Sequence, residues 1–233
     1  MIEDLDFETY LYISKDKFQI FVLNKKKLKN LYSQELKIDH QFDFKDLNIL
    51  LNFLDKNIYK IEKLIGNFIK NIILIVENEK NLKINMGIKK SYETSLKQKS
   101  FSSNLTELKD LFKKNYQDQT IMHMCIINYI IDGKRNSSFD TKLINNYFCI
   151  EVSFIAIDNK LVFAFDNVLE KYQIKIKQYM CGNYINNFIG DTGDEISIIA
   201  NKLRNGLNIN EITIVPKHKE NKGFFEKFFQ LFS

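Results

Sequence analysis

The most constraining feature of this sequence is a long helical repeat that runs directly into a short apolar segment. Eight apolar side chains recur at helical spacing over about six turns. They are Leu47, Leu50, Leu51, Leu54, Ile58, Ile61, Ile65 and Phe68. The run Asn71–Val76 follows and is apolar after its first residue, which is typical of a buried strand. A helix that leads into such a strand indicates a crossover connection, so a sheet with parallel neighbours is expected.

Three strands are expected before this helix. Residues 10–14 and 18–23 are short apolar runs, and the polar stretch 15–17 between them favours a hairpin turn. Residues 28–36 can supply a third antiparallel strand. The first third of the chain therefore predicts the order β-β-β-α-β.

The middle of the chain indicates a second, smaller unit. Strands are predicted at residues 81–90, 121–131 and 147–157, and Asp132-Gly133 is a turn signal after the second of them. An amphipathic helix lies between the first two, with Ser102 or Ser103 as its cap and with Leu105, Leu108, Leu111 and Phe112 on its apolar face. A helix at 161–172 and a strand at 174–179 lead back to the first sheet. The sequence thus predicts an α+β subdomain inserted into an α/β unit.

The last eleven residues, 223–233, carry an unusual density of phenylalanine. On a helix, Phe224, Phe225, Phe228, Phe229, Leu231 and Phe232 form a wide apolar face, while Lys227 lies on the polar side. The preceding stretch 216–222 is polar and basic. This pattern favours an amphipathic helix that lies on a membrane surface or in the groove of a partner. A terminal helix that folds back onto the core is the alternative.

Composition narrows the class of protein further. With 233 residues and 45% hydrophobic content, the chain can bury a real core. The net charge of +5 comes from lysines spread along the chain, so no nucleic-acid partner is expected. The three cysteines, Cys125, Cys149 and Cys181, are far apart and form no metal-binding motif. An acidic N-terminus and the lack of a long apolar run predict neither a signal peptide nor a transmembrane helix, so the thiols are expected to be reduced in the cytosol.

One motif links the chain to a known family. The block 121–133 contains His123, Tyr129, Asp132 and Gly133, which match a His-x(5)-Tyr-x-x-Asp-Gly pattern. This block, the opening hairpins, the long helix before a buried strand and the Phe-rich end resemble the FtsA cell-division family. The resemblance implies an actin-like (ribonuclease H-like) first half with an inserted SHS2-type subdomain, plus the C-terminal amphipathic helix. His123 stands among large apolar residues, and a structural role is expected for it.

The resemblance also implies domain bounds. Residues 8–80 and 158–187 would form the actin-like subdomain and 81–157 the SHS2-type insert. Residues 188–222 would be a helix and basic linker, and 223–233 the membrane-targeting helix. The second actin-like half of the family is expected to be missing.

The chain departs from the family where the nucleotide would bind. The family's first phosphate loop has an Asp-x-Gly pattern, but here Tyr12 stands in place of the carboxylate and Ser14 in place of the glycine. Only Lys17 is kept. We therefore expect a degenerate phosphate loop, no cofactor, no metal and no ATPase activity. The sequence also contains no motif of another enzyme class.

The resemblance, together with the Phe-rich end, implies a peripheral membrane adaptor of bacterial cell division. Its expected partners are inner-membrane lipids, FtsZ or other divisome proteins, and further copies of itself. Its expected location is the cytoplasmic face of the inner membrane at the division septum. In the family the FtsZ peptide docks on the second half, so contact through residues 81–157 is the safer inference. Two alternatives stay open: a PilM-like pilus-assembly platform that binds a partner peptide, and a residual nucleotide-binding actin-like ATPase.

Overall fold

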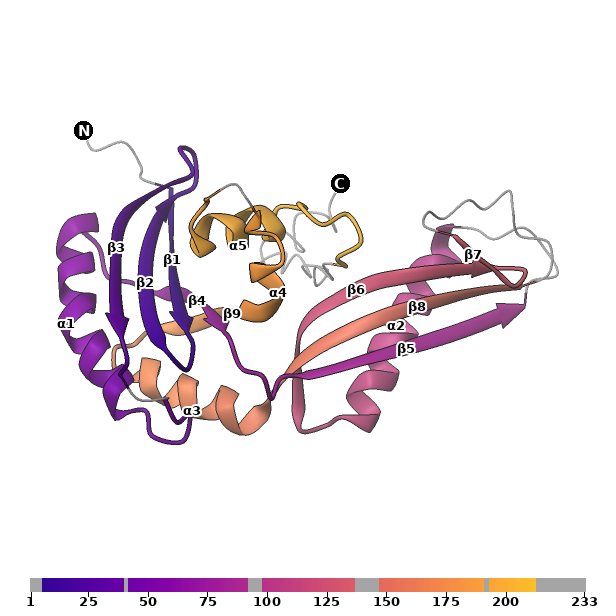
Figure 1. Cartoon of the computed structure of the whole chain (residues 1–233), viewed down its shortest axis with the longest axis horizontal. Helices are drawn as coiled ribbons and strands as arrows, with labels where there is room; N and C mark the ends of the chain where they lie inside the picture. The colour runs from indigo at the N-terminus through magenta and orange to yellow at the C-terminus, as the bar shows by residue number, and fades with distance from the viewer. Residues whose placement is uncertain (1–5, 40–41, 92–97, 137–146, 191–192, 213–233) are drawn as a thin grey trace, which may run out of the picture.

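The chain forms two β-sheets with helices packed on them (Figure 1). Among the residues that the structure describes, the first sheet has five strands and the second has four. The second sheet extends away from the first, so the molecule is elongated (Figure 1). The computed structural model describes residues 6–39, 42–91, 98–136, 147–190 and 193–212.

The first sheet combines an antiparallel meander with two parallel strands. Its strands are β1 (Phe7–Ile13), β2 (Lys17–Asn24), β3 (Lys29–Lys37), β4 (Asn71–Val76) and β9 (Lys175–Cys181). They lie in the order β3-β2-β1-β4-β9. β2 pairs antiparallel with both β1 and β3, whereas β4 runs parallel to β1 and β9. This is a ribonuclease H-like strand order, so the actin-like α/β class expected from the sequence is confirmed.

The expected long helix is α1 (Asn48–Ile65), which connects β3 to β4. It ends at Gly66, whose φ of 71° lies in the left-handed region that glycine adopts without a Cβ clash. Phe68 therefore lies beyond the helix, where its side chain is 80% exposed. Its placement on the apolar face of the helix was wrong, because the periodic pattern continues past the residue that stops the helix.

Helices cover both faces of the first sheet, and this explains its almost continuous apolar strands. Along β1, Leu11 and Ile13 pack in the core that contains α1 and α3 (Asn159–Glu170). Tyr10 and Tyr12 point to the other face, where α4 (Gly182–Asn186) and α5 (Ile196–Arg204) cover the sheet. Successive side chains of this one strand therefore pack in two different hydrophobic cores, one on each face of the sheet.

The second sheet is antiparallel and carries one helix. Its elements are β5 (Leu82–Ser91), α2 (Gln98–Asn115), β6 (Gln119–Ile131), β7 (Lys134–Asn136) and β8 (Tyr147–Asp158), with strand order β5-β8-β6-β7. α2 packs on one face through Phe112, whose ring stacks on Phe154 at 4.7 Å between centroids. Since α2 begins at Gln98, Ser102 and Ser103 lie inside the helix. Their expected capping role was wrong, because the helix extends a turn further than the apolar pattern indicates.

The two sheets share a junction at the base of the second sheet. In sequence, residues 82–158 lie between β4 and the return to the first sheet through α3. Met122 of β6 and Ile155 and Ile157 of β8 are buried in the same core as α1 and α3. The near ends of these strands are therefore held by the first sheet, while the far ends reach the β6–β7 turn (Figure 1).

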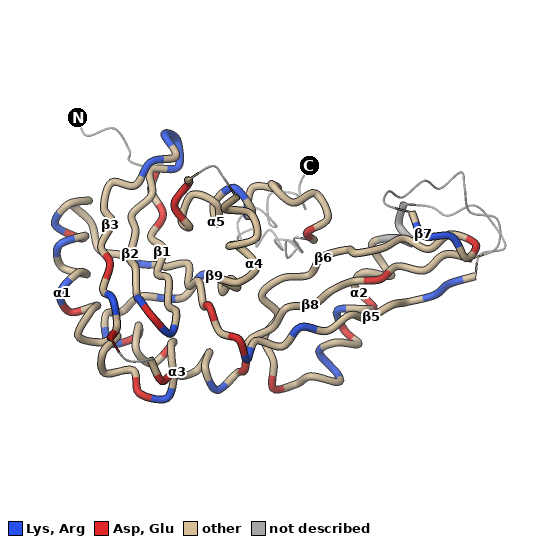
Figure 2. Tube along the Cα trace, viewed as in Figure 1, with Lys and Arg blue, Asp and Glu red and all other residues tan. Residues whose placement is uncertain are grey.

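Basic and acidic residues are interspersed over both sheets and their helices (Figure 2). No helix in the part of the chain that the structure describes is long and apolar enough to cross a membrane. The predicted amphipathic helix at 223–233, with Phe224, Phe225, Lys227, Phe228, Phe229, Leu231 and Phe232, lies outside the described residues.

Candidate functional site

The stretch expected to be a degenerate phosphate loop forms the tight turn between β1 and β2. Ser14 is 3% exposed, and its hydroxyl organises this turn. Its Oγ accepts hydrogen bonds from the backbone N–H groups of Asp16 (3.3 Å) and Lys17 (3.1 Å). It also donates to the carbonyl of Lys17 at 3.1 Å. A phosphate-binding loop needs backbone N–H groups that are open to the ligand, and here the serine hydroxyl already accepts from two of them.

Tyr12, the residue expected in place of the family's carboxylate, lies buried beside this turn. It is 4% exposed, and its hydroxyl donates a hydrogen bond to Glu77 Oε2 at 2.6 Å. Asn186 Nδ2, from α4, donates to the same oxygen at 2.6 Å. Burial and the adjacent Glu77 carboxylate raise the pKa of Tyr12, so the phenol keeps its proton at neutral pH. Tyr12, Glu77 and Asn186 therefore form a fixed hydrogen-bonded set at the carboxyl ends of β1, β4 and β9.

Lys17, the one residue kept from the family pattern, has partners of its own. Its ammonium lies 3.3 Å from Glu35 Oε2 on β3 and 5.9 Å from the centroid of the Tyr12 ring. The ion pair holds this lysine over the β2–β3 side of the turn.

A pocket of about 400 Å³ opens next to these residues. Besides Tyr12, Ser14 and Lys17, its lining includes the carboxylates of Asp16, Glu77 and Glu195. Three carboxylates against one lysine make an unfavourable environment for a polyphosphate, since like charges repel at these distances. The pocket thus lies beside the β1–β2 turn, and three of its four charged lining side chains are acidic.

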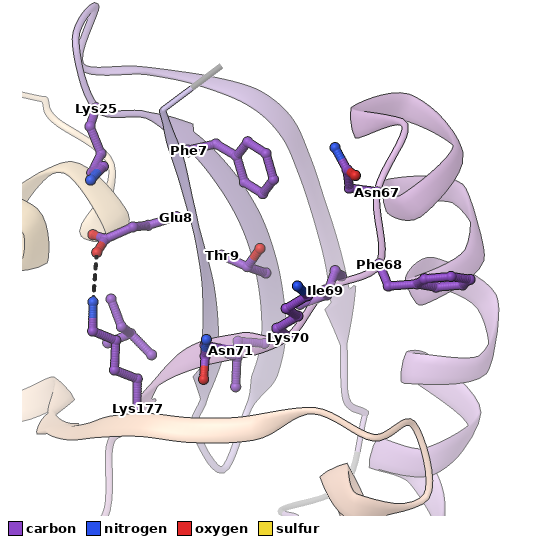
Figure 3. A pocket seen from close by; sticks show the side chains of 12 residues that line it. Phe7, Glu8, Thr9, Lys25, Asn67, Phe68, Ile69, Lys70, Asn71 and Lys177 are labelled. Carbon is purple, nitrogen blue, oxygen red and sulfur yellow. Dashed lines mark ion pairs between the residues drawn. The ribbon is translucent and has the colours of Figure 1, made fainter. Parts of the chain in front are cut away.

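A second pocket, of about 370 Å³, lies at the opposite end of the strands of the first sheet (Figure 3). It lies at the starts of β1 and β4, and its lining contains three lysines and the carboxylate of Glu8. Glu8 Oε2 lies 2.5 Å from Arg204 Nη1, and Glu8 Oε1 lies 3.6 Å from Lys177 Nζ, the ion pair drawn in Figure 3. Burial raises the pKa of Glu8, but the hydrogen bond and charge of Arg204 outweigh it and hold this pKa below 4.5. These contacts tie β1, β9 and α5 together, which indicates a structural cluster.

His123 lies at the junction of the two sheets, with a fully buried side chain. The backbone N–H of Cys181 donates to its Nε2 at 2.9 Å, so this nitrogen has no proton. The proton is therefore on Nδ1, which donates to Glu211 Oε1 at 2.7 Å. Tyr184 completes the cluster: its ring lies 4.3 Å from the imidazole, and its hydroxyl donates to Glu211 Oε2 at 3.0 Å.

The other three residues of the family pattern lie far from His123. Tyr129 is near the far end of β6, where it is paired with Asn136 and with Ile150. Asp132 and Gly133 form the β6–β7 turn, with φ of 47° and 85°, and Asp132 Oδ1 accepts from the N–H of Tyr147 at 2.9 Å. The six residue steps from His123 to Tyr129 along the strand correspond to about 20 Å. The structure does not bring these four residues into one site.

Sequence reasoning missed several residues that complete these clusters. Glu77 follows the last residue of β4 directly, and carboxyl ends of parallel strands are where ligands bind in open α/β sheets. That position is a signal that was available in the sequence. Asn186, Glu211 and Arg204 had no such signal. Within the described ranges, no group of three or more His, Cys, Asp or Glu side chains has the arrangement of a metal site, and the three cysteines are not paired in disulfides.

Comparisons with known proteins add information on the fold alone. No protein-family model matches the chain, and no curated protein matches it. Among solved structures, it is similar to the cytoplasmic domain of EpsL, an inner membrane component of the type II secretion system of Vibrio cholerae. That match has a TM-score of 0.33 and 8% identity, and it covers 76% of this chain and 56% of that chain.

Two further solved structures are similar. A PilM–PilN type IV pilus biogenesis complex matches with a TM-score of 0.45 and 7% identity, over 78% of this chain and 49% of that chain. A Bacteroides thetaiotaomicron VPI-5482 protein with actin-like ATPase fold and unknown function matches with a TM-score of 0.30 and 15% identity, over 81% and 58%. The chain thus spans about half the length of these proteins. At such identities the likeness assigns neither an activity nor a partner to this chain.

Proposed function

We propose that this chain is a non-catalytic adaptor: an actin-like scaffold of the FtsA type that links protein partners to a membrane. The proposed setting is the cytoplasmic face of the bacterial inner membrane at the division septum. The proposed partners are membrane lipids, FtsZ or other divisome proteins, and further copies of the chain. The support comes from one observation in the structure and one in the sequence.

The structural observation is the closed turn at Ser14. The N–H groups of Asp16 and Lys17 donate to the serine hydroxyl, and Tyr12 occupies the place next to them through its bond to Glu77. Binding a phosphate there would require breaking these bonds and placing negative charge near Glu77. An actin-like fold in which the amides of the first loop already donate to the chain's own serine supports a scaffold rather than an ATPase.

The sequence observation is the Phe-rich segment 223–233. Burying one phenylalanine side chain in an apolar environment contributes about 1.5–3 kcal/mol. Each lysine near an anionic membrane surface adds about 1 kcal/mol. Ordering three helical turns opposes these terms, since such a short helix is marginal in water. The sum supports reversible membrane binding, which self-association would strengthen.

Isothermal titration calorimetry with Mg-ATP tests the absence of a nucleotide site. We expect no binding heat above dilution at millimolar ATP, because the loop amides and the tyrosine position are already occupied. Saturable binding by the unmodified chain would contradict the non-catalytic proposal and favour the residual ATPase.

Vesicle co-sedimentation tests the membrane anchor. The full chain should pellet with vesicles that contain anionic phospholipid, and the Phe225→Glu/Phe228→Glu variant should stay in the supernatant. A matched control, Asn221→Glu/Gln230→Glu, adds the same two charges away from the apolar face and should lose only part of the binding. Equal pelleting of all three proteins, or of none, would contradict the proposal that residues 223–233 bind the membrane.

Adding FtsZ to the same assay separates the partner from the anchor. FtsZ should pellet only when both the full chain and the vesicles are present. If the chain pellets and FtsZ does not, FtsZ is not a partner of this chain, and the proposal of membrane binding is unaffected.

A further inference from the structure

One end of the first sheet is rich in lysine. Four segments meet there, and all four line the pocket of Figure 3: residues 6–9, 24–29, 66–71 and 171–177. We call this surface the basic end, and its β2–β3 turn is blue in Figure 2. The four segments carry two carboxylates, Asp6 and Glu8, and eight lysines: Lys25, Lys26, Lys27, Lys29, Lys70, Lys171, Lys175 and Lys177.

Both carboxylates of the basic end already have partners. Asp6 Oδ1 lies 2.6 Å from Lys25 Nζ, and Glu8 is paired with the guanidinium of Arg204. Five of the lysines are exposed and have no acidic partner among the residues that the structure describes: Lys26, Lys27, Lys29, Lys70 and Lys175. This end of the sheet therefore has an excess of positive charge, which favours an anionic partner.

A large apolar side chain projects from the same end. Phe68 comes two residues after Gly66, where α1 stops, and its side chain is 80% exposed. Its ring points away from the other labelled side chains (Figure 3). A phenylalanine in this position contributes little to the core of the fold, so its apolar surface is available to a partner.

Leu28 is a second exposed apolar side chain, at the β2–β3 turn. It stands between Lys27 and Lys29, is 40% exposed and has a φ of 48°. This left-handed conformation is strained for leucine, whereas glycine adopts it without a Cβ clash. A strained, exposed leucine between two lysines indicates a use for its side chain outside the fold.

The lysines are spread over a surface rather than gathered around one point. From β2 to β9 the strand order β2-β1-β4-β9 contains three strand spacings, or about 14 Å. A single small anion cannot contact lysines at both sides of such a surface. An anionic bilayer can, because its charged headgroups are repeated in a plane, and its interface also accepts apolar side chains.

We propose that the basic end is a second membrane contact of this chain. Its lysines bind the headgroups of anionic phospholipids, and Phe68 and Leu28 enter the interface between them. This inference rests on the proposed function, since it adds to the C-terminal anchor and does not replace it. It also gives the fold an orientation: Tyr12, at the opposite end of the strands, would face away from the bilayer.

Vesicle titration of the full chain tests the role of the lysines. The vesicles are phosphatidylcholine with and without phosphatidylserine. Each lysine near an anionic surface strengthens binding by about fivefold. Lys26→Glu/Lys27→Glu should therefore bind the phosphatidylserine vesicles at least about tenfold more weakly than the unmodified chain.

The matched control is Lys134→Glu/Arg135→Glu, which makes the same change of charge on β7, at the far end of the second sheet. It should lose less than about threefold, because charges far from the membrane are screened. Equal losses in the two variants would overturn the second contact and leave the C-terminal anchor intact. No binding of the unmodified chain would overturn both.

Tryptophan fluorescence tests whether the apolar side chains enter the bilayer. The chain contains no tryptophan, so a single one can be introduced as a reporter. Phe68→Trp should be quenched on binding vesicles whose lipids carry bromine on their acyl chains. Phe163→Trp is the matched control, since Phe163 is 68% exposed on α3, and it should not be quenched.

The same measurement distinguishes a bilayer from an acidic protein as the partner. If both tryptophan variants bind the vesicles and neither is quenched, Phe68 stays in water and the membrane contact is overturned in favour of a protein partner. Equal quenching of the two variants would also overturn it, because insertion would then not be specific to the basic end.

Discussion

His123 accepts a hydrogen bond from the backbone N–H of Cys181 and thereby links β6 of the second sheet to the end of β9 in the first. The same ring donates to Glu211, so three segments that are distant in sequence meet at one imidazole. The side chain is fully buried and both ring nitrogens are hydrogen-bonded, so the imidazole connects the two sheets; we call this contact the His123 joint.

The joint predicts a large loss of stability on removing the ring. His123→Ala should lower the free energy of unfolding by about 3 kcal/mol, because it leaves a cavity and removes the partner of a buried N–H group. Glu211→Gln keeps an oxygen that can accept from Nδ1 and should cost only about 1 kcal/mol. Urea unfolding of both variants measures the difference. Equal losses would show that charge on Glu211, not the bonding of the ring, stabilises the junction.

A second prediction concerns the close approach of Gly182 to Glu77. A Cβ atom at Gly182 would lie 2.7 Å from Glu77 Cβ and 3.1 Å from its backbone N and Cα. Gly182→Ala should therefore displace Glu77, weaken its bonds to Tyr12 and Asn186, and cost about 1–3 kcal/mol. Gly87→Ala is the matched control, since its Cβ would meet its nearest atom at 3.5 Å. Thermal unfolding that ranks the two variants equally would contradict the tight contact.

The Glu8 cluster predicts a dependence of stability on pH. The pKa of Glu8 is lower in the folded chain than its ordinary value of 4.5, so the unfolded chain binds more protons between the two values. The stabilisation by Glu8 is thus complete above about pH 4.5 and is lost as the pH falls through the folded value. Glu8→Gln should be less stable than the unmodified protein at pH 7, by about 1–3 kcal/mol.

The difference between these two proteins should shrink toward pH 3. Glu79→Gln serves as the control: its carboxylate also lies 3.0 Å from a lysine, but its side chain is 79% exposed. This variant should follow the pH profile of the unmodified protein. A Glu8→Gln deficit that stays constant from pH 7 to pH 3 would contradict the shifted carboxyl group.

The backbone conformation of the β6–β7 turn predicts that two substitutions of Gly133 differ in their cost to stability. Gly133 has a φ of 85°, where an alanine is strained and an asparagine less so. Gly133→Ala should cost about 1–2 kcal/mol and Gly133→Asn distinctly less. Chemical denaturation of the pair measures the gap. If alanine is tolerated as well as asparagine, the left-handed turn is not required for folding.

Several elements were predictable because their signals are local. The bounds of β4 match the apolar run Asn71–Val76, and the turn signal Asp132-Gly133 gives a real turn with both residues at positive φ. The five-residue helix α4 was not expected, because it is too short to show a helical period. The start of α2 was missed for a related reason, since its first turn lacks the apolar spacing of the rest.

The candidate sites were harder to predict than the elements, because their residues are far apart in the sequence. Tyr12 and Ser14 could be placed in the β1–β2 region from sequence, but the partner of Tyr12 is Glu77, 65 positions away. His123 and Glu211 are separated by 88 positions. Pairs like these depend on how the sheets are packed, and no periodicity within one segment contains that information.

The length of the second sheet has a mechanical consequence. The thirteen residues of β6 span about 40 Å at the usual rise of a strand. The sheet is held at one end by the His123 joint and the shared core, and its other end carries the β6–β7 turn. From His123 to Ile131 the strand spans eight residue steps, or about 26 Å, so a rotation of about 6° at His123 would move its far end by about 3 Å. A small rotation at the junction of the two sheets would thus be amplified at the β6–β7 turn.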